Sequence, residues 1–165
     1  MAPGVTLRTP QTSDAAEFVA QVLDSRELHA PWVNPPADVR EFSDWLAKTQ
    51  SESQVSFLVV QQTKLAGVVN VTNVVRGNFC SAYLGYYAFA RSARTGVMTE
   101  GLRKVCRHAF NVMGLHRLEA NIQPANTASI ALAKRCGFKL EGYSPKYLKV
   151  RGRWRDHERW ALVKP

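Results

Sequence analysis

The sequence contains few cysteines and no long apolar run. Among its 165 residues no apolar stretch approaches the roughly 20 of a membrane span, and residues 1–10 lack the cationic start and apolar core of a signal peptide. Cys80, Cys106 and Cys136 are too widely spaced for a disulfide framework or a metal site, and the four histidines are scattered as well. We therefore expect a cytoplasmic protein that needs neither a membrane nor a metal ion.

Acidic residues are also scarce. The chain has 13 Asp and Glu against 22 Lys and Arg, a formal net charge of +9. A basic surface attracts phosphate groups, whether on nucleic acid or on a small anionic cofactor, but charge alone does not distinguish these from a merely solvated surface. The length favours one domain spanning residues 1–165.

The first half of the chain is patterned as a strand, two helices and an antiparallel meander. Ser13 is expected to cap the first helix and Asp38 to begin the second. The prolines within residues 29–36 exclude a continuous helix there and predict a loop. Short apolar runs, many of them β-branched, predict strands at residues 5–8, 55–61, 65–75 and 81–88.

The pattern in the second half changes to helical periodicity. Apolar residues from Met98 to Met113 form one stripe of a helix predicted over residues 95–112, which Gly114 ends. Asn126 is expected to cap a helix that stops at Gly137. Further strands are predicted at residues 117–122, 138–150 and 153–162. This order of elements predicts a mixed α/β layer fold.

The passage from the strand at residues 81–88 into the long helix carries the strongest functional signal. A helix N-terminus presents unpaired N–H groups and a positive dipole end, which suit a diphosphate. Gly96 would let the backbone approach phosphate oxygens closely. Arg91 and Arg94 add positive charge beside it.

Several motifs, taken together, resemble the GNAT N-acetyltransferases. Arg91-Ser92-Ala93-Arg94-Thr95-Gly96 is similar to their acetyl-CoA loop, Q/R-x-x-G-x-G/A, with Arg94 in place of the first glycine. The helix that begins at Asn126 and closes with Gly137-Phe138 resembles the family's N-x-x-S…K-x-x-G-F stretch. Trp154-Arg155-Asp156-His157, after the Gly152 turn, resembles the RimJ/RimL branch, and the likeness runs over nearly the whole chain.

The resemblance implies a fold and a set of cofactor-binding residues. The fold would be a three-layer α-β-α arrangement, with a central, twisted, mostly antiparallel sheet of six to seven strands and about four helices. Acetyl-CoA would be the cosubstrate. Asn126 would bond its pantetheine arm, in addition to capping a helix, and Ser129 would protonate or orient the leaving thiolate. The remaining implied contacts are Tyr87, Ala88 and Phe89 at the strand end and Arg91, Arg94, Thr95, Gly96, Val97, Met98 and Thr99 around the loop.

The general base is less evident from the sequence. Some relatives carry a glutamate five residues before the asparagine, where this chain has Asn121. A neutral amide cannot take a proton, although it could hold a water molecule. Glu119, two residues earlier, could act through water or could equally pair with an arginine. We expect His157 to make a bond within the last hairpin.

Three functions remain open at this stage. The first is acetylation of a protein N-terminus, with a ribosomal protein as acceptor and association with the ribosome, and with Trp32, Tyr86 and Tyr147 contacting the acceptor. An α-amine has an ordinary pKa near 7.7–8.0, against about 10.4 for lysine, so it needs a weaker base. The second is acetylation of a small amine such as a polyamine, an amino acid or an antibiotic. The third is a CoA- or RNA-binding module without turnover. The sequence is compatible with a monomer or a homodimer.

Overall fold

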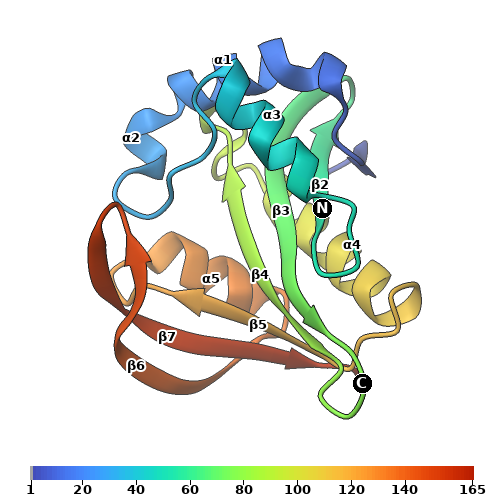
Figure 1. The fold of residues 1–165 in the computed structure, drawn as a ribbon, viewed down its shortest axis with the longest axis vertical. Coiled ribbons are helices and arrows are strands. Elements are labelled where there is room, and N and C mark those ends of the chain that lie inside the picture. Colours follow the sequence, from blue (N-terminus) through green and yellow to red (C-terminus); the bar gives the residue numbers. More distant parts are fainter. Residues whose placement is uncertain (1) are drawn as a thin grey trace.

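The structure is a computed structural model that describes residues 2–165. One seven-stranded sheet runs through it in the order β1-β2-β3-β4-β5-β7-β6 (Figure 1). Only β4 and β5 are parallel, and every other neighbouring pair is antiparallel. The strands are β1 Val5–Arg8, β2 Val55–Gln61, β3 Lys64–Val75, β4 Ser81–Ala88, β5 Arg117–Ile122, β6 Lys139–Val150 and β7 Arg153–Val163.

Five α-helices cover the two faces of this sheet. On one face lie α1, α2 and α3, and on the other lie α4 and α5 (Figure 1). The predicted mixed α/β fold is therefore confirmed. The bounds are α1 Ala15–Asp24, α2 Arg26–His29, α3 Val39–Lys48, α4 Val97–Asn111 and α5 Thr127–Arg135, with single 3-10 turns at Thr12–Asp14 and Ala90–Ser92.

Two apolar layers hold the helices to the sheet. Phe18 of α1 and Phe42 of α3 pack with their rings 4.9 Å apart above Leu58 and Val68 of the sheet. On the other face α4 buries the predicted stripe, from Met98 to Ala109, against β1, β2 and β3. Alternating side chains of β4 and β5 enter this second layer, so the remaining side chains of these strands face the other side of the sheet.

Most predicted boundaries hold within two residues, and the differences have local causes. The first helix begins at Ala15 with Asp14 at its N-cap, so the prediction that Ser13 caps it is wrong. Arg8 binds the Asp14 carboxylate through two N–H groups at 2.7 and 2.9 Å, which places the helix cap one residue later than the predicted Ser13. The loop predicted at residues 29–36 begins one residue later than predicted, because His29 is the last residue of α2.

None of the helices within residues 2–165 has the length and apolar character that crossing a membrane requires.

Candidate active site

The parallel pairing of β4 with β5 stops partway along both strands. It runs from Ser81 opposite Arg117 to Leu84 opposite Ala120, although β4 continues to Ala88 and β5 to Ile122. Beyond that point the strands separate, and a cleft of about 90 Å³ opens between them. Its walls are Trp32, Val33, Leu84, Gly85, Tyr86, Ala120, Asn121, Ile122, Gln123, Asn126, Ser129 and His157.

The main chain of β4 offers hydrogen-bonding groups to this opening. The N–H of Phe89 donates to the Ala66 carbonyl at 2.8 Å, so Phe89 faces β3. In an antiparallel strand, the main-chain groups of successive residues point alternately toward the two neighbouring strands. Those of Tyr86 and Ala88 therefore point away from β3 and toward the cleft. The Ala88 carbonyl accepts a bond from Nε2 of His29 at 2.7 Å, which ties the end of β4 to α2.

One wall of the cleft, on the α5 side, is built around Ser129. Asn126 caps α5 by accepting the Ser129 N–H at 3.4 Å, as the sequence predicted. The Ser129 hydroxyl lies 3.2 Å from the Tyr86 hydroxyl, which in turn donates to the Ser129 carbonyl at 3.2 Å. Burial raises the pKa of Tyr86 far above its ordinary value, so its phenol keeps its proton. Tyr86, predicted to contact the acceptor, lines the cleft and bonds to Ser129 within it, and its contact with an acceptor stays a prediction.

The loop before α4 has the backbone shape that the sequence pattern implied. Gly96 has φ +84° and is the N-cap of α4, which begins at Val97. Arg94 also has a positive φ, +62°, a conformation that favours glycine. Thr95 donates its hydroxyl to the Ser92 carbonyl at 2.6 Å and closes the turn. The first N–H groups of α4 therefore open onto solvent beside two exposed arginines, Arg91 and Arg94.

Several residues predicted to bind the cofactor can offer it only their main chain. The side chains of Phe89, Val97 and Met98 are buried in the apolar layers, and the Tyr87 ring packs against His29 and Phe89. The Thr99 side chain accepts a bond from Arg135 at 3.3 Å, which joins α4 to α5.

The opposite wall combines side chains from distant parts of the sequence. Trp32 and Val33 follow α2, Asn121 lies on β5, and His157 lies on β7. Arg151, at the tip of the β6–β7 hairpin, donates to the Val33 carbonyl at 3.1 Å and holds this wall together (Figure 1). Tyr147 does not line the cleft, but its ring lies 6.3 Å from that of His157.

Of Glu119, considered as a base acting through water, and Asn121, considered only as a residue that could hold a water molecule, the structure brings only Asn121 to the cleft. Glu119 accepts two bonds from Arg117, the shorter at 2.8 Å, and is not among the cleft residues. The sequence analysis did not single out Gln123, whose buried side-chain nitrogen has no hydrogen-bond partner within residues 2–165. It also gave His157 only a structural role, because nothing in one sequence shows which strand lies next to β5.

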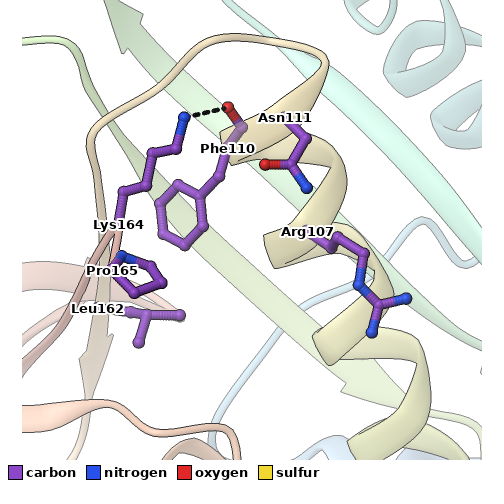
Figure 2. Close-up of a pocket in the computed structure, with 6 residues that line it drawn as sticks. All are labelled: Arg107, Phe110, Asn111, Leu162, Lys164 and Pro165. Atoms are coloured by element: carbon purple, nitrogen blue, oxygen red, sulfur yellow. Dashed lines mark hydrogen bonds between the residues drawn. The ribbon is translucent and has the colours of Figure 1, made fainter.

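A second, larger hollow of about 370 Å³ lies at the far end of α4. Figure 2 shows its walls, where the Lys164 ammonium reaches the Phe110 carbonyl at 3.4 Å beside Leu162 and Pro165. No hydroxyl, imidazole or acidic side chain lines it. We therefore place the active site at the smaller cleft.

Comparison with known proteins agrees with this geometry. Residues 5–139 match the family model "Acetyltransferase (GNAT) domain". The chain is 40% identical to the [Ribosomal protein uS5]-alanine N-acetyltransferase of Escherichia coli, over 98% of this chain and 88% of that protein. It is 32% identical to a probable N-acetyltransferase, YjcK, of Bacillus subtilis, over 98% and 94% of the two chains. The solved structure of Mycobacterium smegmatis RimJ in complex with CoA-disulfide superposes with a TM-score of 0.90 at 29% identity, covering 96% of this chain and 81% of that one.

The chain thus belongs to the GNAT family of acetyltransferases. It is an N-acetyltransferase close to the ribosomal-protein enzyme RimJ, and acetyl-CoA is its acetyl donor.

The burial of His29 makes stability depend on pH. His29 is buried, and desolvation lowers its pKa more than the Ala88 carbonyl raises it, with nearby Arg151 lowering it further. An unfolded histidine has a pKa near 6.5, so the unfolded state binds a proton first as the pH falls. Stability should therefore decrease below about pH 6.5. His29→Gln, which can still donate to Ala88, should lose less stability between pH 7.5 and 5 in urea titrations.

The exposed His116 supplies the matched control, since His116→Gln should keep the wild-type pH dependence. If His29→Gln kept it too, His29 would not be the group responsible.

Proposed function

We propose that this enzyme acetylates the N-terminal α-amine of a ribosomal protein. The main support is 40% identity, over nearly the whole chain, to an enzyme named for the alanine of ribosomal protein uS5. The cleft walls support the same acceptor, because none of the twelve side chains that line the cleft is acidic. A polyamine carries several positive charges and would need carboxylates, whereas one terminal amine on a peptide does not.

The residues at the β4–β5 opening fit acetyl-CoA. The main-chain groups of Tyr86 and Ala88 would bond the pantetheine arm, and the first turn of α4 with Arg91 and Arg94 would hold the diphosphate. Bound there, acetyl-CoA supplies an activated acetyl group. The Ser129 hydroxyl, oriented by Tyr86, would give a proton to the departing sulfur.

Substitution of Gly96 tests this proposed diphosphate-binding site. A Cβ at Gly96 would meet no protein atom within 4 Å, so it would intrude only on a ligand at the helix N-terminus. Gly96→Ala should weaken CoA binding about 10- to 100-fold, the loss of one or two charge-assisted bonds. Calorimetric titration with CoA measures this.

Gly77 provides a matched control, since its φ is +76° and its Cβ would also meet nothing within 4 Å. Gly77→Ala carries the same backbone strain in the turn between β3 and β4, and should bind CoA as wild type does. Equal CoA affinities of the wild type, Gly96→Ala and Gly77→Ala would contradict the proposed diphosphate-binding site.

The acceptor is tested with short peptides that begin with alanine or serine and contain one internal lysine. We expect the acetyl group on the terminal amine only, located by tandem mass spectrometry. The same peptides with a blocked N-terminus should not react. Faster turnover of spermidine, of free amino acids or of the lysine side chain would contradict this proposal.

Association with the ribosome would follow from the charge on the β6–β7 hairpin. Lys146, Lys149, Arg151 and Arg153 are exposed near its tip beside Trp154, whose side chain is 60% exposed. Cations interleaved with an aromatic ring suit the phosphates and bases of RNA. A ribosomal acceptor would also place the enzyme in the cytoplasm.

Sedimentation with ribosomes at increasing salt tests this association. Affinity should fall steeply with salt, and the double substitution Lys149→Ala/Arg153→Ala should lower the log–log slope by about two. Arg40→Ala/Lys64→Ala, two exposed cations elsewhere, should leave the slope nearly unchanged. Binding that does not depend on salt would contradict the proposal.

A further inference from the structure

The cleft has two chemically different walls. Ser129 lies on α5 and Asn126 caps that helix, which is on the same side of the sheet as α4 (Figure 1). Trp32 follows α2, which lies on the opposite side, and His157 lines the cleft from β7. The main-chain groups of Tyr86 lie between them at the separation of β4 and β5. An acetyl donor held by α4 and β4 would therefore present its carbonyl carbon to an amine entering past Trp32 and His157.

The imidazole of His157 is held in one orientation. Its Nδ1 lies 2.8 Å from the carbonyl of Arg155, an acceptor, so Nδ1 carries the hydrogen. In the neutral ring this leaves Nε2 with a free lone pair. The ring is only 3% exposed and lines the cleft, so this lone pair is a buried proton acceptor on the acceptor side.

The pairing of β5 with β7 explains why His157 reaches the cleft. It ends with Ile122 opposite Glu158, so His157 lies one residue past the last pair, beside Gln123. Across β6 the register shifts between Ser144 and Leu148, which leaves Tyr147 with its ring 6.3 Å from the imidazole.

We propose that His157 is the group that removes the proton from the acceptor's ammonium before it attacks. This inference rests on the proposed function. The ammonium gives one proton to Nε2, and the freed nitrogen lone pair forms the bond to the acetyl carbon as the carbon–sulfur bond breaks. The nitrogen then loses its second proton to water, while the departing sulfur takes one from Ser129. Ser129 and His157 exchange protons with water, so the reaction releases one proton overall.

The other candidate bases nearby are already engaged. Asn121 is an amide, and Glu119 is bonded to Arg117 away from the cleft. The Asp156 carboxylate accepts the Tyr143 hydroxyl at 2.5 Å and the Lys146 N–H at 2.8 Å. His157 is therefore the one proton acceptor with a free lone pair among the cleft-lining side chains of residues 2–165.

The charged and titratable groups that surround the imidazole come from four strands. Those near it or on its face of the sheet are Arg155, Asp156 and Arg159 on β7, Tyr147 on β6, Tyr83 on β4 and Glu119 on β5, with Arg151 at the hairpin tip. Tyr147 raises the pKa of the Tyr83 phenol above its ordinary value, so Tyr83 remains neutral.

The decisive variant is His157→Asn, whose amide nitrogen can keep the bond to the Arg155 carbonyl but whose side chain takes no proton. We measure kcat/KM for an alanine-initiated peptide from pH 6 to 9.5. At pH 6.5 the variant should be about 100-fold slower or more. The deficit should shrink above pH 8–9, because an α-amine with an ordinary pKa of 7.7–8.0 is then already neutral and needs no base. Added imidazole should raise the variant's rate at low pH.

Controls separate this role from a structural one. CoA affinity and the urea midpoint of His157→Asn should match wild type, and His116→Asn should keep the wild-type rate. A rate deficit of the same factor at every pH, without rescue by imidazole, would overturn the role of His157 while leaving the proposed function in place. If the wild-type enzyme acetylated no peptide at any pH, both proposals would fall.

Discussion

The separation of β4 from β5 after four paired residues is the constraint on which the rest of the site depends. Each strand continues, but its partners change. The end of β4 is held by β3 and, through the Ala88 carbonyl, by His29 of α2, while the end of β5 pairs with β7 as far as Ile122. Both strand ends are therefore fixed by other neighbours, and the gap between them is a property of the folded framework.

In the proposed function this gap would give the two substrates separate entrances. The start of α4 lies on the side of the sheet where α5 carries Ser129, and Trp32 and His157 line the cleft on the other side, with the main-chain groups of β4 between the two walls. In the proposed mechanism the proton donor for the sulfur, Ser129, and the proton acceptor for the amine, His157, therefore lie on opposite walls. They need not share one proton, and each can be oriented by its own partner, Tyr86 in one case and the Arg155 carbonyl in the other.

Local sequence patterns predicted the elements well, because helical and alternating periodicity record burial directly. The Gly96 loop and the Asn126 cap were predicted for the same reason, since each depends on residues close in sequence. The shift of the first cap to Asp14 could not be seen, because it depends on Arg8 across a turn. Nor could the place of His157 beside β5, which arises from strand order and register. The pairing of Glu119 with Arg117, by contrast, joins two residues of one strand and was one of the two roles that the sequence left open for Glu119.

Arg94 shows how the cofactor loop can keep its shape without its expected glycine. Its φ of +62° is the left-handed conformation, which costs an L-residue roughly 1–2 kcal/mol relative to its ordinary conformations. The closed turn made by Thr95 and Ser92 holds it there. The backbone N–H groups thus keep the orientation that glycine would give them, and the side chain adds an exposed guanidinium beside the start of α4. That helix end already favours anions. Arginine in place of glycine therefore costs conformational energy in the backbone but adds a positive charge where a diphosphate would bind.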